Sequence, residues 1–394
     1  MDTDSILQLR FTPNMSPESQ TTAPLEAAAM TVAACAGEGA VRIERRPRPA
    51  PGPGEMLLRL RCAGLCGTDL FKLGDPAHGT QGTAAAGAVL GHEIVGTVAV
   101  LGAGVQGFAP GDRVAVPHHA ACGECALCRR GNEPLCPAFR ENLLVPGGFS
   151  EWVLVRERAV RQTVFGLPPH LADEAAIFLE PAACVLRGVR HARLAETALA
   201  GPVPGCAAIL GGGSMGLLHL LVLKAVHPDL RVAVSDPLEE RLALARRLGA
   251  DAAAAPGEAT RNAVAELSGN LGADAVFDTA GGAGPLEAAL AISRPGGAVV
   301  LFAHAASEAH GERAGFDLNA FFKAELRLLA SYSSSLADQR EVYRLLVSRR
   351  LDPSPLVTHR LPLSRFQEAV ALARERRALK VLLVPDLISE EEAG

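Results

Sequence analysis

Short hydrophobic runs separated by glycine and proline dominate the first part of the chain, from about residue 30 to residue 161. Runs of this length and composition, bounded by turn residues, predict β-strands. An apolar stretch follows at 173–189 and predicts a helix. The strand candidates read MLLRLRCAG (56–64), EIVGTVAVLG (93–102), DRVAVP (112–117) and SEWVLV (150–155).

The pattern then changes to strands that alternate with amphipathic or apolar helices. A buried-strand candidate, CAAIL, is followed by GGGSMG and an apolar helix, and the alternation continues for about a hundred residues. This rhythm predicts a doubly wound parallel sheet. The segments are CAAIL (206–210), LLHLLVLKAV (217–226), RVAVSD (231–236), LEERLALARRLG (238–249), DAVFDTAG (274–281) and GAVVLFA (297–303).

The last sixty residues contain further helix and strand candidates that do not extend this alternation, and we expect them to fold back onto the first domain. The fold class is therefore α/β, with a doubly wound parallel-sheet domain beside a β-rich domain. The expected divisions are a disordered extension (1–29), a β-rich domain (30–185), a nucleotide-binding domain (186–331) and a C-terminal return (332–394).

Composition narrows the classes of function. The chain has 394 residues, 48% of them hydrophobic, and a net charge of −5 without a long basic run, so nucleic acid and anionic membranes are poor candidates for partners. Nine cysteines, an odd number, fit a reducing compartment better than a disulfide framework. The polar first 29 residues lack the apolar core of a signal peptide. We therefore expect a cytoplasmic protein.

Four cysteines lie within sixteen residues, in the turn-rich stretch ACGECALCRRGNEPLC (121–136). Their spacing, C-x2-C-x2-C-x7-C, suits four thiolates around one tetrahedral Zn²⁺. Because protein atoms would fill every coordination position, such an ion would be structural. An iron–sulfur cluster and a chance grouping are the alternatives. The four candidate ligands are Cys122, Cys125, Cys128 and Cys136.

A second set of metal-binding residue types is scattered over three segments. GLCGTDL supplies Cys66, GHEIVG supplies His92 and Glu93, and LEPAACV supplies Glu180, with Cys184 four residues later. One thiolate, one imidazole and one carboxylate would make a neutral three-ligand zinc site with an open position for substrate. Taken singly, a cysteine in a strand or a lone histidine is more often a core residue.

The glycine-rich segment between the first strand and helix of the doubly wound part has the G-x-G-x-x-G spacing. Its glycines, Gly211, Gly213 and Gly216, would permit a tight turn and the close approach of a dinucleotide pyrophosphate to the helix N-terminus, with Ser214 and Met215 in the same turn. Asp236 follows twenty residues later, at the end of the next strand. A carboxylate there favours NAD over NADP, although it could instead merely cap the following helix.

In this order, these motifs resemble the zinc-dependent medium-chain alcohol dehydrogenase family, with closest similarity to its sorbitol and threonine dehydrogenase-like branch, over about residues 30–385. The resemblance implies a GroES-like catalytic domain joined to a Rossmann cofactor domain, two Zn²⁺ per chain, NAD, and a homodimer or homotetramer. It implies that Cys66, His92 and Glu180 bind the catalytic zinc. Cys184, at the family's other ligand position, is then a small buried helix residue.

By the same resemblance, Glu93 is a carboxylate that can approach the metal, and Thr68 supplies the hydroxyl that first accepts the substrate proton. Thr68 could also be a simple turn residue. Some family members continue the relay with a histidine where Phe71 stands here, so the later steps of the relay are not defined. Phe71 and His78 could line the substrate pocket, although a loop histidine is more often solvated.

The sequence therefore predicts an oxidoreductase that transfers a hydride between NAD and a secondary alcohol, of the polyol, sugar or amino-alcohol class. An aldehyde or ketone reductase of the same family is the alternative enzyme. A catalytically silent zinc- and nucleotide-binding protein is the alternative outside enzymes.

Overall fold

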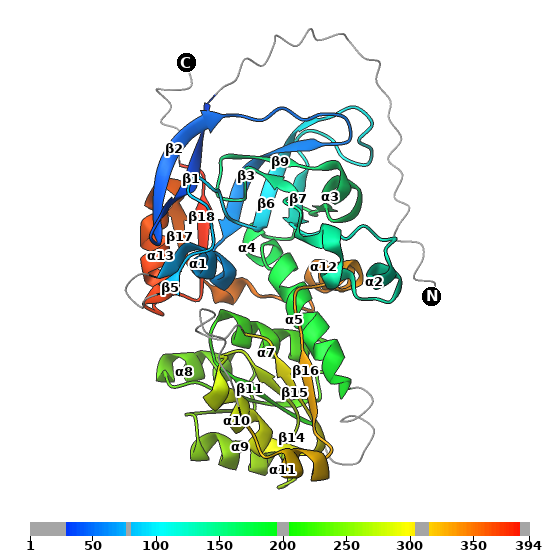
Figure 1. Ribbon diagram of the computed structural model, residues 1–394, viewed down its shortest axis with the longest axis vertical. Coiled ribbons are helices and arrows are strands. Elements are labelled where there is room, and N and C mark those ends of the chain that lie inside the picture. The colour runs from blue at the N-terminus through cyan, green and yellow to red at the C-terminus, as the bar shows by residue number, and fades with distance from the viewer. Residues whose placement is uncertain (1–28, 76–79, 195–204, 304–314, 387–394) are drawn as a thin grey trace.

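Two sheets of different kinds organise the molecule, and the long helix α5 (Leu179–Ala192) runs between them (Figure 1). The computed structural model describes residues 29–75, 80–194, 205–303 and 315–386. The extension expected at 1–29 lies outside the described residues except for Ala29, which begins the first strand. No helix in these ranges is both long and apolar enough to cross a membrane.

The upper part in Figure 1 is rich in antiparallel strands. Its main sheet has the order β10-β7-β6-β3-β18-β17, β9 pairs with β3 and β8, and two small sheets pair β1 with β2 and β4 with β5. Its strands are β1 (Ala29–Gly37), β2 (Ala40–Pro47), β3 (Met56–Gly64), β4 (Gly74–Asp75), β5 (Thr80–Gln81), β6 (Glu93–Leu101), β7 (Arg113–Pro117), β8 (Leu144–Val145), β9 (Trp152–Val155) and β10 (Phe165–Gly166), and its helices are α1 (Gly67–Leu73), α2 (Ala126–Arg129), η3 (Glu133–Leu135), η4 (Pro137–Arg140), α3 (Glu157–Gln162) and α4 (Asp173–Ala176).

The lower part is a six-stranded parallel sheet with the order β13-β12-β11-β14-β15-β16. This 3-2-1-4-5-6 arrangement is that of a Rossmann sheet, and it confirms the predicted doubly wound fold class. The sheet and its helices comprise β11 (Cys206–Leu210), α7 (Ser214–Val226), β12 (Arg231–Ser235), α8 (Glu239–Arg247), β13 (Ala252–Ala254), α9 (Glu258–Ser268), β14 (Ala273–Asp278), α10 (Ala283–Ile292), β15 (Ser293–Leu301), α11 (Leu318–Lys323) and β16 (Arg327–Ala330).

The C-terminal segment returns to the upper part. Its last strand, β18, pairs antiparallel with β3, where Leu382 lies opposite Gly64. The two large hydrophobic clusters meet at this return, because β18 contributes Leu382 to one cluster and Val381 and Leu383 to the other. The segment consists of α12 (Leu336–Val347), η5 (Ser354–Leu356), β17 (Val357–Pro362), η6 (Leu363–Arg365), α13 (Phe366–Arg374) and β18 (Lys380–Val384).

The helix expected at 173–189 is instead two helices, α4 and α5, interrupted at Ile177 and Phe178. Pro181 explains the interruption, since it lacks the N–H that would bond to the Ile177 carbonyl and its ring would crowd that carbonyl. Within the first turn of a new helix the same proline is tolerated.

Helix α5 also runs without a break across the division expected at residues 185/186, so the domain boundaries stay predictions.

Candidate metal centres and cofactor site

The four cysteines of the loop after β7 converge on one point. The Sγ of Cys122 lies 3.8 Å from that of Cys128 and 3.5 Å from that of Cys136, and the Sγ atoms of Cys125 and Cys128 are 3.5 Å apart. A tetrahedral Zn²⁺ with Zn–S bonds of ~2.3 Å requires sulfurs ~3.8 Å apart. The spacing and the all-thiolate chemistry therefore fit a single ion enclosed by the four residues.

Main-chain groups of this loop favour the thiolate form. The N–H of Cys125 donates to the Sγ of Cys122, and the N–H of Cys122 donates to the Sγ of Cys136, each at 3.4 Å. Hydrogen bonds from the main chain at Glu124 and Cys125 lower the pKa of the Cys122 thiol to about 6. The loop thus supplies polar support as well as four sulfur atoms, which suits a cation in its centre.

A second group forms where β3 and β6 meet. These strands are antiparallel with Gly64 opposite Glu93, so the residues just beyond β3 and just before β6 face each other. Cys66 follows β3 as the N-cap residue of α1, and His92 directly precedes β6. One ligand atom from each of Cys66, His92 and Glu93 lies within 4.8 Å of the others.

Glu180 lies beside this group but is not one of the three that meet most closely. It occupies the first turn of α5 and is 9% exposed, and its Oε1 accepts a hydrogen bond from the Cys184 Sγ at 3.5 Å. Burial raises the pKa of its carboxyl group, against the opposing effect of His92. A cation bound by Cys66 and His92 would stabilise the carboxylate form. The donor set, with two soft or borderline ligands and a nearby carboxylate, fits a zinc ion.

The glycine-rich turn joins β11 to α7 in the lower part. Gly211 has a φ of +103°, and a Cβ at Gly216 would lie 1.7 Å from the Gly211 carbonyl oxygen, so the turn requires glycine at both places. Gly213 is the N-cap residue of α7, whose first turn contains Ser214 and Met215. The N-terminus of α7 could therefore offer its first N–H groups to a pyrophosphate.

Asp236 closes the same site from the end of β12. Its Oδ2 accepts the Gly212 N–H at 2.7 Å, and its Oδ1 accepts the Leu238 N–H at 2.9 Å. Leu238, not Asp236, is the N-cap residue of α8. The carboxylate thus joins the glycine-rich turn to the start of α8 and keeps lone pairs for further donors.

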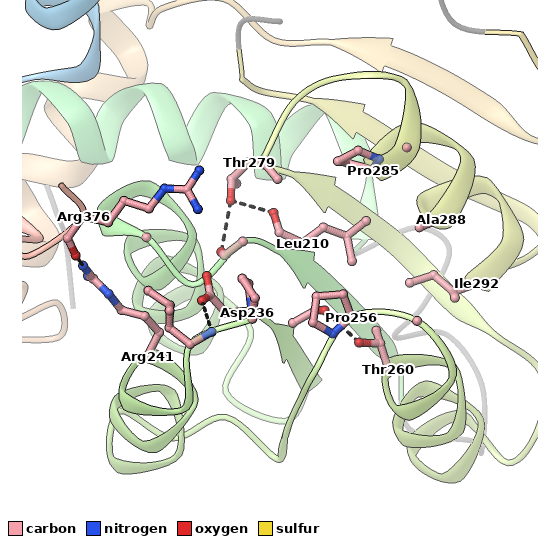
Figure 2. Close-up of a pocket in the computed structure, with 18 of the residues that line it drawn as sticks. Leu210, Asp236, Arg241, Pro256, Thr260, Thr279, Pro285, Ala288, Ile292 and Arg376 are labelled. Carbon is pink, nitrogen blue, oxygen red and sulfur yellow. Dashed lines mark hydrogen bonds between the residues drawn. The ribbon is translucent and has the colours of Figure 1, made fainter. Parts of the chain in front are cut away.

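A cavity of about 600 Å³ opens beside this carboxylate (Figure 2). Its walls come from the glycine-rich turn, the β12–α8 connection, α10 and the C-terminal segment around Arg376. The Arg241 guanidinium is 7% exposed and donates to the carbonyls of Arg376 and Ala378 at 2.7 and 3.1 Å. This side chain therefore joins the cofactor sheet to the returning segment at the mouth of the cavity.

The chain was compared with known proteins. Two family models match it: the alcohol dehydrogenase GroES-like domain over residues 52–164 and the zinc-binding dehydrogenase over residues 214–348. A D-altritol 5-dehydrogenase of Agrobacterium fabrum is 34% identical over 79% of this chain and 86% of its own length. The chain belongs to the zinc-dependent medium-chain alcohol dehydrogenase family.

Other matches support the same assignment. A sorbitol dehydrogenase of Halalkalibacterium halodurans is 28% identical over 89% of this chain and 97% of its own length. The structure of an alcohol dehydrogenase from Thermus sp. ATN1 superposes with a TM-score of 0.77 at 30% identity, covering 90% of this chain and 100% of that chain. The resemblance inferred from the motifs, with its GroES-like and Rossmann parts, is thus confirmed.

In this member of the family, Asp69 is a site residue that the sequence analysis did not single out. It is fully buried, and its Oδ1 lies 3.2 Å from the His92 Nδ1. It also accepts the N–H groups of Cys66 at 3.1 Å and Gly91 at 3.3 Å. A carboxylate at Nδ1 leaves the Nε2 of His92 available as a metal ligand. The signal was present, since Asp69 lies three residues after Cys66 in the same motif.

Lys380 is a second residue that the sequence analysis missed. Its Nζ donates to both carboxylate oxygens of Glu93, at 2.8 and 2.7 Å, and to the Leu65 carbonyl at 3.3 Å. Burial disfavours the ammonium, but the negative charges of Glu93 and Cys66 raise the pKa of Lys380 overall. Because Lys380 is almost three hundred residues from Glu93, no local pattern could have indicated the pair.

His118 and His119 also lie beside the metal residues. The Nδ1 of His118 is 4.0 Å from the Glu180 Oε1, and its ring centroid is 4.7 Å from that of His92. Burial lowers the pKa of both imidazoles, that of His119 to about 3, so both rings are neutral near pH 7.

Thr68 lies in the first turn of α1 and is partly exposed, two residues from Cys66. His78 lies outside the described residues.

Proposed function

We propose that this chain is an NAD-dependent zinc enzyme that transfers a hydride between NAD and a secondary alcohol of the polyol, sugar or amino-alcohol class. The observation that carries the proposal is the meeting of Cys66, His92 and Glu93 in a molecule whose second sheet has a Rossmann strand order. The names of its relatives, a D-altritol and a sorbitol dehydrogenase among them, support a polyol as the substrate.

The proposed catalytic zinc ligands are Cys66, His92 and Glu180, with a second, structural zinc at the four cysteines. A zinc ion bound at the first site would lower the pKa of a substrate hydroxyl, as zinc does for water. Cys66 and Glu180 would make that site formally neutral. The hydrogen bond to Asp69 would fix the tautomer of His92.

The remaining residues of the site would move the proton and hold the geometry. We assign the first acceptor of the substrate proton to Thr68, whose hydroxyl lies in the same helical turn as Asp69. Glu93 is assigned the role of the neighbouring carboxylate. Since Lys380 holds both of its oxygens, an approach of Glu93 to the metal would require that ion pair to open.

NAD is proposed over NADP because Asp236 lies where the adenosine ribose is expected. A carboxylate can accept hydrogen bonds from the 2′- and 3′-hydroxyls and repels a 2′-phosphate. The proposal is checked by replacing Asp236 with serine and comparing kcat/KM for the two cofactors. We expect the preference for NAD to fall by roughly tenfold or more, which is about 1.4 kcal/mol. An unchanged preference would assign cofactor choice to other residues.

The main experiment is an NADH absorbance assay over a panel of polyols, simple secondary alcohols and amino-alcohols, with and without a metal chelator. We expect turnover of at least one secondary alcohol, lost on chelation and restored by zinc. NAD binding is measured on the same samples by calorimetry. Failure of every alcohol together with retained NAD binding would support a silent zinc- and nucleotide-binding protein instead.

We further propose a cytoplasmic homodimer or homotetramer. All nine cysteines are free in the structure, which suits a reducing compartment. The parallel sheet ends at β16, and nearby on α11 the side chains of Leu318 and Phe322 are 72% and 77% exposed. Such an edge with exposed apolar side chains favours pairing with a second copy. Light scattering of the purified chain tests this, and a concentration-independent monomer would contradict it.

A further inference from the structure

The pairing of β6 with β7 brings two histidines together at the metal site. In this antiparallel pair Glu93 lies opposite Pro117, so His92, just before β6, comes next to His118, just after β7. Their ring centroids are 4.7 Å apart, with 49° between the ring planes. His118 therefore packs against a proposed zinc ligand because of strand register.

The ring contacts continue from His118 into the four-cysteine loop. The rings of His118 and His119 have centroids 3.4 Å apart, and those of His119 and Phe139 are 4.2 Å apart. Phe139 is 2% exposed and packs with Ala121 and Cys136. We call His92, His118, His119 and Phe139 the ring stack; it joins the two candidate metal centres.

Phe139 is fixed by the cysteines themselves. Its N–H donates to the Cys136 carbonyl at 2.9 Å, and the side chains of Cys122, Cys125 and Cys128 pack against the small cluster that contains it. An ion held by the four sulfurs would therefore fix the outer end of the ring stack. The inner end is His92, whose ring edge is bonded to the side chains of Asp69 and Cys66.

Packing, not hydrogen bonding, holds the two middle rings. The Nδ1 atoms of His118 and His119 are buried and have no hydrogen-bond partner among the residues that the structure describes. Buried polar atoms without partners are uncommon and costly. The contacts between ring faces therefore explain why aromatic side chains occupy these two positions.

We infer that the ring stack positions His92 from the four-cysteine loop, so that the structural metal centre sets the geometry of the catalytic one. This inference rests on the proposed function, because it requires a metal ion at each centre. The hydrogen bonds that His92 makes with the Asp69 and Cys66 side chains act at the edge of its ring and leave the ring free to tilt, and the face of His118 removes that freedom. His119 and Phe139 are thus positioning residues, which act on the metal centre through His118.

The test uses the full chain with zinc at the four cysteines and Co²⁺ at the Cys66 and His92 site. The visible spectrum of Co²⁺ reports the geometry of its ligands, and its rate of release to a chelator reports how firmly they hold it. His119→Ala removes one ring, and His119→Phe keeps a ring of similar shape without the unpartnered nitrogen. Phe139→Leu removes the outer ring. Phe366→Leu, at a 1% exposed phenylalanine in another part of the core, is the matched control.

We expect His119→Ala and Phe139→Leu to shift the cobalt bands and to speed cobalt release by roughly tenfold, the scale seen when a partner of a metal ligand is lost. His119→Phe should keep the wild-type spectrum and release rate and should not lower Tm. Phe366→Leu should lower Tm without changing the spectrum.

Three results would overturn the inference: an unchanged spectrum and release rate in His119→Ala, an equal defect in His119→Phe, or the same spectral change in Phe366→Leu. The proposed function fails in a different way. In that case the unmodified chain itself would take up no cobalt at the Cys66 and His92 site.

Discussion

Lys380 places its ammonium nitrogen 2.7 and 2.8 Å from the two carboxylate oxygens of Glu93, and both side chains are at most 3% exposed. Each is the first residue of its strand, and β3 lies between those strands in the sheet. Gly64 in β3 leaves the room they need, since a Cβ there would lie 2.1 Å from a Glu93 oxygen. The ion pair therefore depends on the return of the C-terminal segment.

Replacing one member of this pair should destabilise the fold strongly. Lys380→Met leaves the Glu93 carboxylate buried without its partner, a loss of about 3 kcal/mol in the free energy of unfolding. The double variant Lys380→Met with Glu93→Gln should recover part of that loss, because no unpaired charge remains. Urea unfolding followed by circular dichroism measures the free energy of unfolding of each single variant and of the double variant. If the losses caused by Lys380→Met alone and by Glu93→Gln alone simply added in the double variant, the two side chains would not be coupled as the structure has them.

Asp69 should govern how tightly a metal ion is held at the proposed catalytic site. Asp69→Asn keeps the shape of the side chain but replaces the charged acceptor of the His92 ring, so metal affinity should fall by roughly tenfold or more. Chelator competition gives the affinity. Asp112→Asn is the control, because this exposed carboxylate accepts only a local N–H, that of Ala109 at 2.7 Å. Equal effects in the two variants would mean that Asp69 does not support metal binding through His92.

The two proposed metal centres should respond differently when each loses a ligand residue. Cys66→Ala is expected to abolish turnover while NAD affinity stays within about twofold of that of the unmodified chain. Cys128→Ser should first lower Tm, because the four-cysteine loop has little core of its own apart from Phe139. Thermal unfolding and calorimetric titration with NAD separate the cases. Comparable loss of folding in both variants would contradict this division.

The glycine-rich turn offers a matched pair of substitutions. No atom lies within 4 Å of a Cβ placed at Gly213, so Gly213→Ala should fold normally and weaken NAD binding by crowding the pyrophosphate. At Gly216 the new Cβ would lie 1.7 Å from the Gly211 oxygen, and the fold should lose about 2 kcal/mol. Tm and NAD affinity are measured for both. Normal stability in Gly216→Ala would show that the turn can shift.

His219 should make stability depend on pH. Its ring is fully buried between α7 and the sheet, and burial lowers its pKa from 6.5 to about 4. As the pH falls from 6.5 towards 4, the unfolded chain binds a proton that the folded chain does not, so folded stability decreases. From pH 7.5 to pH 5 the loss is about 2 kcal/mol for this group.

The measurement for His219 is urea unfolding at both pH values for the unmodified chain and for His219→Leu. Other buried histidines titrate in both proteins, so only the difference between them belongs to His219. The variant should lose about 2 kcal/mol less on acidification. An identical pH dependence in the two proteins would mean that the pKa of His219 is the same in the folded and the unfolded chain.

Most elements could be predicted because their signals are local. The strand expected at 56–64 is β3 with the same bounds, and the alternation after residue 205 is the parallel sheet. The expected return of the tail is seen in the pairing of β18 with β3. The single helix expected at 173–189 is wrong in one respect, since Pro181 interrupts it at Ile177 and Phe178.

The candidate site likewise has residues that local motifs predict and one whose expected place the structure does not reproduce directly. Cys66, His92, Glu93 and the four cysteines lie in short motifs whose residue types indicate metal binding, and the structure brings each group together. Glu180 was expected among the catalytic ligands. The structure places it beside the group of Cys66, His92 and Glu93, where it accepts a hydrogen bond from Cys184. Its role stays a prediction that metal binding to the purified chain would test.

The sequence by itself determined the two sheets, the glycine-rich turn and the cysteine loop, because hydrophobic period, turn residues and ligand spacing act within a few residues of one another. Only the tertiary structure decided the partners of these motifs: Lys380 for Glu93, Arg241 for the carbonyls of the returning segment, and His118 for His92. The physical reason is that strand order and register, not distance along the chain, fix which side chains share a buried space.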